Sequence, residues 1–155
     1  MMTNYQEQSL AGATGVELVV ALYNGLVRFL YQALACIDEG DIRGRRISVK
    51  KALDIVMYLQ ARLRLDLGGE TAASLSDFYA AIFTMTLEAS HEDSHDKMEE
   101  VIQCVRSVRE AWIIAARDPE AGRVLPRELR TQEERFLAPA VVEAVGEPAS
   151  AGWSA

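Results

Sequence analysis

The longest apolar pattern in the chain lies between Glu17 and Asp38 and predicts one long helix. Asn24, Arg28 and Gln32 interrupt it, so the segment is too polar for a membrane span. Its apolar residues cover two neighbouring helical faces: Leu18, Leu22, Leu26, Phe29, Ala33 and Ile37 on one, and Val19, Tyr23, Val27, Leu30 and Leu34 on the other. A helix that is apolar over most of its circumference is covered by several neighbours. We therefore expect this segment to be the helix against which the others pack.

A second helix is predicted after Gly40, which ends the first helix, and Asp41, which caps the next one. Its expected buried stripe is Val49, Ala52, Leu53, Val56, Leu59 and Leu63. Gly68 and Gly69 end this helix.

Two more helices complete the pattern. The third is predicted from about Glu70 to Ser90, and the fourth from a cap at Asp93 or Ser94 to about Arg117. The third has the stripe Leu75, Phe78, Tyr79, Ile82 and Thr86, and the fourth has Met98, Val101, Val105, Val108, Trp112 and Ala115. No alternating pattern typical of strands occurs, so the fold class is all-α, an antiparallel four-helix bundle.

The segments outside the bundle differ in composition. We divide the chain into an N-terminal segment, 1–13, a bundle, 14–118, and a tail, 119–155, which contains all four prolines. Apolar residues between 125 and 145 leave two alternatives for the tail: a loosely ordered chain, or short helices that fold back on the bundle.

Composition narrows the partners and the compartment. The chain has 155 residues and a formal charge of -7, which argues against nucleic acid as the main partner. The N-terminus lacks the pattern of a signal peptide, and we expect no membrane insertion. Cys36 and Cys104 lie within apolar helical patterns and are expected to be reduced thiols of a cytoplasmic protein.

Candidate enzymatic chemistry is confined to one short stretch. The spacing Glu-x-x-His, which di-iron bundles use, occurs at Glu88–His91 and again at Glu92–His95. Di-iron sites need the motif on two different helices, whereas both copies here fall in one polar link that we expect to face water. A metal-binding bundle therefore stays only as an alternative, and we expect no enzymatic activity and no cofactor.

An excess of apolar residues lies off the predicted stripes. Examples are Ile47, Ile55 and Tyr58 on the second helix, Met85 and Leu87 on the third, and Ile113 and Ile114 on the fourth. The excess is either ordinary exposed apolar surface or a groove for partner helices. On the second interpretation, Ile55, Tyr58 and Met85 are the predicted groove residues.

Five short motifs, in order, give the chain a resemblance to a known family. They are Tyr5 and Leu10 followed by Ala13, Thr14, Glu17 and Leu18; Leu22-Tyr23-Asn24-Gly25; Glu39-Gly40-Asp41; Gly68-Gly69-Glu70 with Ala72, Leu75 and Tyr79; and Ala111-Trp112. In the order and spacing of these motifs, the chain resembles the FliS family, the flagellin-specific secretion chaperones of bacterial flagella, over residues 5 to about 117.

The resemblance implies a bundle without enzymatic activity that binds the disordered C-terminal segment of flagellin. It implies that binding prevents premature polymerisation and that the complex is delivered to the export gate protein FlhA. Tyr5 and Leu10 would belong to an N-terminal segment that caps part of the groove and contributes to gate docking. The chain departs from the family at Asp66-Leu67, Ala81 and Thr84-Met85, which keeps a divergent helical adaptor for another flagellar client as an alternative.

Overall fold

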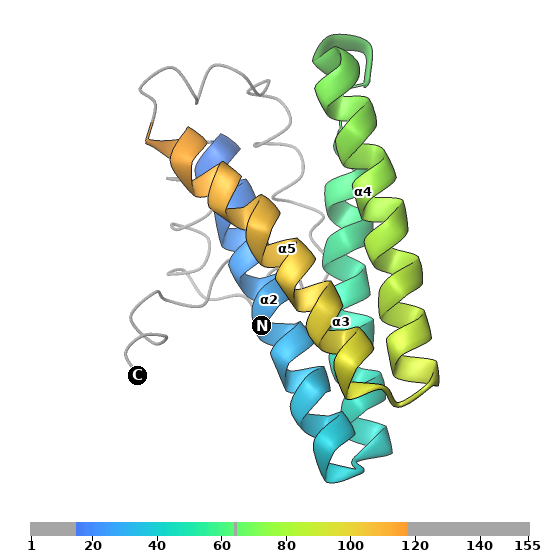
Figure 1. Ribbon diagram of the computed structural model, residues 1–155. Helices are drawn as coiled ribbons and strands as arrows, with labels where there is room; N and C mark the ends of the chain where they lie inside the picture. The colour runs from blue at the N-terminus through green and yellow to red at the C-terminus, as the bar shows by residue number, and fades with distance from the viewer. Residues whose placement is uncertain (1–14, 64, 118–155) are drawn as a thin grey trace, which may run out of the picture.

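The computed structural model describes residues 15–63 and 65–117, and their side chains except for those of 65–68. They form four helices: α2 (Gly15–Glu39), α3 (Ile42–Ala61), α4 (Leu65–His91) and α5 (His95–Ala116). Figure 1 shows them as an up-and-down bundle, which confirms the predicted all-α fold. The predicted segments 1–13 and 119–155 lie outside the described residues.

The predicted caps place the helix boundaries. Gly40 adopts a φ of 70°, a left-handed conformation that costs glycine little, and ends α2. The carboxylate of Asp41 then accepts a 2.9 Å hydrogen bond from the backbone N–H of Gly44, and the hydroxyl of Ser94 accepts one of 3.1 Å from Lys97. Both caps satisfy backbone donors that the first helical turn leaves unpaired.

The double glycine acts as a kink rather than as a clean break. Helical structure continues from Leu65, and Gly69 interrupts it with the non-helical angles φ 56° and ψ -136°. The third predicted helix, from Glu70 onward, is therefore the straight part of α4. Only at Gly69 does this helix need a residue that tolerates positive φ.

The four helices form a square in cross-section. α2 packs against α3 and α5, α4 packs against the same two helices, and α2 and α4 face each other across the diagonal. α2 supplies eleven buried residues, which confirms it as the central helix. By length and composition it is also the one described helix that could cross a membrane, and 56% of that apolar window is buried inside the bundle.

Ile55, Trp112 and Ala115 are among the side chains whose burial differs from the prediction. Ile55 is 0% exposed and belongs to the core, so its placement off the core stripe was wrong. The reason is that α3 packs between α2 and α4 and buries a wide arc, which includes Ile55 next to Ala52 and Leu59. Trp112 is only half-buried, and Ala115 is exposed, because the end of α5 packs less closely than its start.

Candidate partner-binding groove

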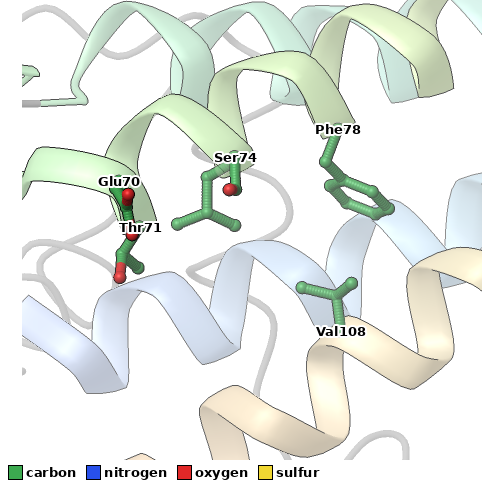
Figure 2. A pocket seen from close by; sticks show the side chains of 6 residues that line it. Glu70, Thr71, Ser74, Phe78 and Val108 are labelled. Atoms are coloured by element: carbon green, nitrogen blue, oxygen red, sulfur yellow. The ribbon is translucent and has the colours of Figure 1, made fainter.

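An open hollow of about 510 Å³ lies between the first half of α4 and the second half of α5. In Figure 1 these two helix segments diverge toward the end of the bundle where α4 begins. The residues that line the hollow are Glu70, Thr71, Ser74, Leu75, Phe78 and Val108. Figure 2 shows Phe78 and Val108 facing each other across it, with the polar side chains Glu70, Thr71 and Ser74 nearer the start of α4. The hollow thus has an apolar part and a polar rim, which suits an amphipathic helix.

Aromatic rings lie beside this groove and connect three helices. Phe78 and Tyr79 of α4 have ring centroids 5.7 Å apart. Tyr79 is 6.3 Å from Tyr23 of α2, and Tyr23 is 6.4 Å from Trp112 of α5. Tilted rings at these separations attract each other. The series therefore holds the α4 and α5 walls at a fixed distance from the central helix.

A buried hydrogen bond strengthens this connection. The Tyr23 hydroxyl donates to the Tyr79 hydroxyl at 2.7 Å, and the two side chains are 0% and 1% exposed. Burial raises the pKa of Tyr23 to about 12, against the smaller opposing effects of its Tyr79 and Trp112 hydrogen bonds. Burial also raises the pKa of Tyr79, and the neighbouring Tyr23 adds to the rise. Both phenols are therefore neutral at physiological pH.

The predicted groove residues lie in three different environments. Met85 is half-buried and stands seven residues after Phe78, so it lies two turns farther along the same face of α4. Ile55 is inside the core. Gln60 faces α4, since its Nε2 donates a 3.1 Å hydrogen bond to the Ser76 carbonyl oxygen. Tyr58 is about 200° around α3 from Gln60 and points away from α4.

The remaining sequence-predicted residues divide between the groove and the undescribed segments. Tyr5 and Leu10 lie outside the described residues. Leu75, Phe78 and Val108 were assigned to core stripes, and all three are half-buried residues that line the groove. Their helical spacing could not reveal this, because a residue on a core stripe is exposed only where two helices diverge.

The polar link that contains His91 and His95 lies at the opposite end of the bundle. His95 Nδ1 lies 2.7 Å from Asp38 Oδ1, and both side chains are about half exposed. Arg45 of α3 forms a 2.8 Å ion pair with Asp93 in the α4–α5 turn. Within residues 15–63 and 65–117 no group of three His, Cys, Asp or Glu side chains is arranged to hold a metal ion. Within the described residues, His95 thus connects the start of α5 to the end of α2.

Comparison with known proteins identifies relatives of the whole bundle. The family model FliS, described as flagellar protein FliS, matches residues 1–119. The flagellar secretion chaperone FliS of Campylobacter jejuni is 33% identical over 110 residues, which are 70% of this chain and 86% of that protein. The proteins of the same name from Vibrio cholerae and Bacillus subtilis are 27% and 29% identical, over 68% and 71% of this chain and 78% and 81% of theirs.

Proposed function

The chain belongs to the FliS family of flagellar proteins, and we propose that it is a cytoplasmic export chaperone for flagellin. In this proposal it binds the disordered C-terminal segment of flagellin, prevents premature polymerisation and delivers the client to the export gate protein FlhA. It acts by binding alone, without enzymatic activity or a cofactor. The observation that carries the proposal is the open, partly apolar groove between α4 and α5.

The chemistry of the groove matches that of the proposed client. A client helix would place its apolar side against Leu75, Phe78 and Val108, and its polar side along Glu70, Thr71 and Ser74. Masking the apolar side of such a helix removes the surface through which flagellin ends associate. The groove therefore supplies both affinity and protection against assembly.

The size of the groove requires further contacts. A hollow of about 510 Å³ holds only a short stretch of helix, whereas ordering a disordered segment costs free energy that only a large interface offsets. Met85 extends the apolar face of α4 beyond the hollow. Tyr58, on another side of the bundle, offers a second contact to a client that wraps around it. Ile55 supports this surface from the core and makes no client contact.

The N-terminal residues complete the proposal. From the family resemblance, we propose that the segment containing Tyr5 and Leu10 covers part of the groove in the free protein and contributes to FlhA docking. Deleting residues 1–13 should leave the free energy of unfolding unchanged but reduce export. Equal amide-exchange protection of this segment with and without a flagellin peptide would contradict displacement.

The central experiment blocks the groove without touching the core. Ser74 is exposed and lines the groove, so Ser74→Trp fills the hollow. Ala73 is exposed, does not line the hollow and lies one position around the helix, which makes Ala73→Trp the matched control. Calorimetry with a flagellin C-terminal peptide should show affinity lowered about tenfold or more by Ser74→Trp and unchanged by Ala73→Trp.

Two outcomes would overturn the proposal. Equal affinity for both tryptophan variants would show that the client binds elsewhere. A folded wild-type protein that fails to bind the flagellin peptide would favour the alternative of a helical adaptor for another flagellar client.

A further inference from the structure

The outward face of α3 combines basic and apolar side chains. α3 contains five basic residues and one acidic residue, in a chain whose formal charge is -7. Residues at three- and four-residue spacing share one side of a helix, and one such side lies opposite the buried stripe of α3. We call it the α3 outer face: Ile42, Arg43, Arg46, Ile47, Lys50 and Met57.

Two cations on this face have no side-chain partner among the described residues. Other basic residues of α3 are engaged: Arg45 with Asp93 at 2.8 Å, and Lys50 with Asp54 at 2.9 Å. Arg43 and Arg46 are exposed and form no ion pair or hydrogen bond with any side chain in residues 15–63 and 65–117. The ten guanidinium N–H donors of these two side chains meet no acceptor side chain within the described ranges.

The same face also exposes large apolar side chains. Ile42, Ile47 and Met57 are 52%, 48% and 50% exposed. They are three of the six large hydrophobic residues that are exposed within the described part of the chain. Unpaired arginines interleaved with exposed aliphatic residues are typical of protein interfaces, in which arginine and methionine are enriched.

We propose that the α3 outer face docks an acidic amphipathic helix of a second protein. From residue 42 to residue 57 the face is about 22 Å long and one helix wide, which matches a helix of about four turns. Carboxylates of the partner would pair with Arg43 and Arg46, for which guanidinium groups have the matching bidentate geometry. Leucine-sized side chains one turn apart would cover Ile47 and Met57.

The net negative charge of this chain favours a short acidic protein segment over an extended polyanion as the partner. Nucleic acid or an anionic membrane would also face the rest of the surface, whose net charge is negative. A single helix contacts only the α3 outer face and meets less of that repulsion. The pairing is therefore favourable for a narrow acidic partner.

The position of the face permits two partners at once. The groove lies between α4 and α5, whereas the α3 outer face lies opposite the side of α3 that packs on α2 and α4. A partner on α3 therefore leaves the groove open. The conclusion that this chain can hold flagellin and a second protein at the same time rests on the proposed function. The docking of an acidic helix on α3 is argued independently of that function.

A designed peptide tests the docking chemistry directly. The probe is a synthetic eighteen-residue helix with glutamates on one side and leucines on the other, and its control is a shuffled peptide without an apolar side. We expect the probe to shift the NMR amide signals of residues 42–57 in the full chain. Arg46→Glu should lower its affinity about tenfold, because it brings like charges together. Arg117→Glu, which changes the net charge equally at the exposed residue after the end of α5, should leave the affinity unchanged.

A second pair of variants tests the apolar part. Ile47→Ser should weaken probe binding about fivefold through loss of buried apolar area, whereas Leu87→Ser, at a residue of similar exposure on α4, should not. The same Arg46→Glu protein should bind the flagellin peptide normally, and Ser74→Trp should bind the acidic probe normally. A failure of one site is thereby distinguished from a failure of the other.

Four results would overturn the inference. These are probe shifts that map to α4 and α5, equal binding of the shuffled peptide, tighter Arg46-dependent binding to phosphatidylserine vesicles, and self-association that Arg46→Glu abolishes. The vesicle result would assign the face to a membrane, and sedimentation that reveals the self-association would assign it to a second copy of this chain.

Discussion

The Tyr23 hydroxyl donates a 2.7 Å hydrogen bond to the Tyr79 hydroxyl and thereby joins α2 to α4 across the diagonal of the bundle. Neighbouring helices pack through broad apolar contact, but α2 and α4 share little of it. The tyrosine pair is consequently a direct polar connection that helps to fix how far α4 stands from the central helix. Since Phe78 directly precedes Tyr79 and their ring centroids are 5.7 Å apart, the same pair positions one wall of the groove.

Tyr79→Phe should destabilise the bundle by about 1–2 kcal/mol, because it leaves the buried Tyr23 hydroxyl without its acceptor. The double variant Tyr23→Phe/Tyr79→Phe should lie within about 1 kcal/mol of wild type, since both hydroxyls are then gone and only the half-buried Trp112 loses a hydrogen-bond partner. Urea unfolding of the two single variants and the double variant gives the coupling energy. Additive effects would show that the hydrogen bond contributes no coupling.

The same pair predicts alkaline unfolding. The pKa of Tyr23 is raised from 10.0 to about 12, mainly by burial. Because the pKa of Tyr23 is higher in the folded state, the contribution of Tyr23 to stability is complete below pH 10 and is lost as the pH rises toward 12. We expect the wild type to lose stability between pH 10 and 12, and the double phenylalanine variant to lose less. Circular dichroism against pH measures this, and parallel curves for the two proteins would contradict it.

Thr86 predicts a stabilising substitution. Its side chain is 1% exposed, and its hydroxyl has no hydrogen-bond partner among the described residues. Valine has nearly the same shape without the polar group, and an unpaired buried hydroxyl costs about 1–3 kcal/mol. Thr86→Val should therefore stabilise the protein by about 1 kcal/mol in urea unfolding. Thr84→Val, at an exposed position on the same helix, is the control that should change little.

Local signals in the sequence were sufficient for the helix boundaries but not for the groove. Asp41 and Ser94 cap helices through contacts three residues away, so their role is set by neighbouring residues. The exposure of Phe78 and Val108 instead depends on how far α4 and α5 diverge, which distant contacts such as Tyr23–Tyr79 determine. Trp112 was predicted on the core stripe and is half-buried for the same reason.

Ile55 shows how a narrow view of a helical stripe misplaces a residue. Its neighbours on the wheel, Ala52 and Leu59, were assigned to the core, whereas Ile55 was not. A helix with neighbours on two sides buries a wider arc than a helix with one, and α3 packs on both α2 and α4. The width of the buried arc of a helix depends on how many helices pack against it. The sequence pattern of one helix does not reveal that number.

Ile55→Ala should accordingly cost about 2–4 kcal/mol of stability, the usual loss when a buried isoleucine is truncated. Ile47→Ala, on the exposed face of the same helix, should cost about 0.5 kcal/mol or less. Thermal or urea unfolding distinguishes the two. A small loss for Ile55→Ala would place this residue back on the surface and return it to the predicted partner contacts.

The last prediction concerns His95, which holds the start of α5 to the end of α2. Its pKa is raised above 6.5, first by the hydrogen bond to Asp38 and then by the charges of Asp38, Glu99 and Asp96. A group whose pKa is higher in the folded state stabilises the fold fully below its unfolded pKa, and this contribution is lost as the pH rises through the folded value. The stability difference between wild type and His95→Gln should therefore be largest below pH 6.5 and shrink above it. NMR titration of the His95 ring should give a pKa above 6.5 in the wild type and a lower one in Asp38→Asn. Equal pKa values in the two proteins would show that the 2.7 Å contact does not form in solution.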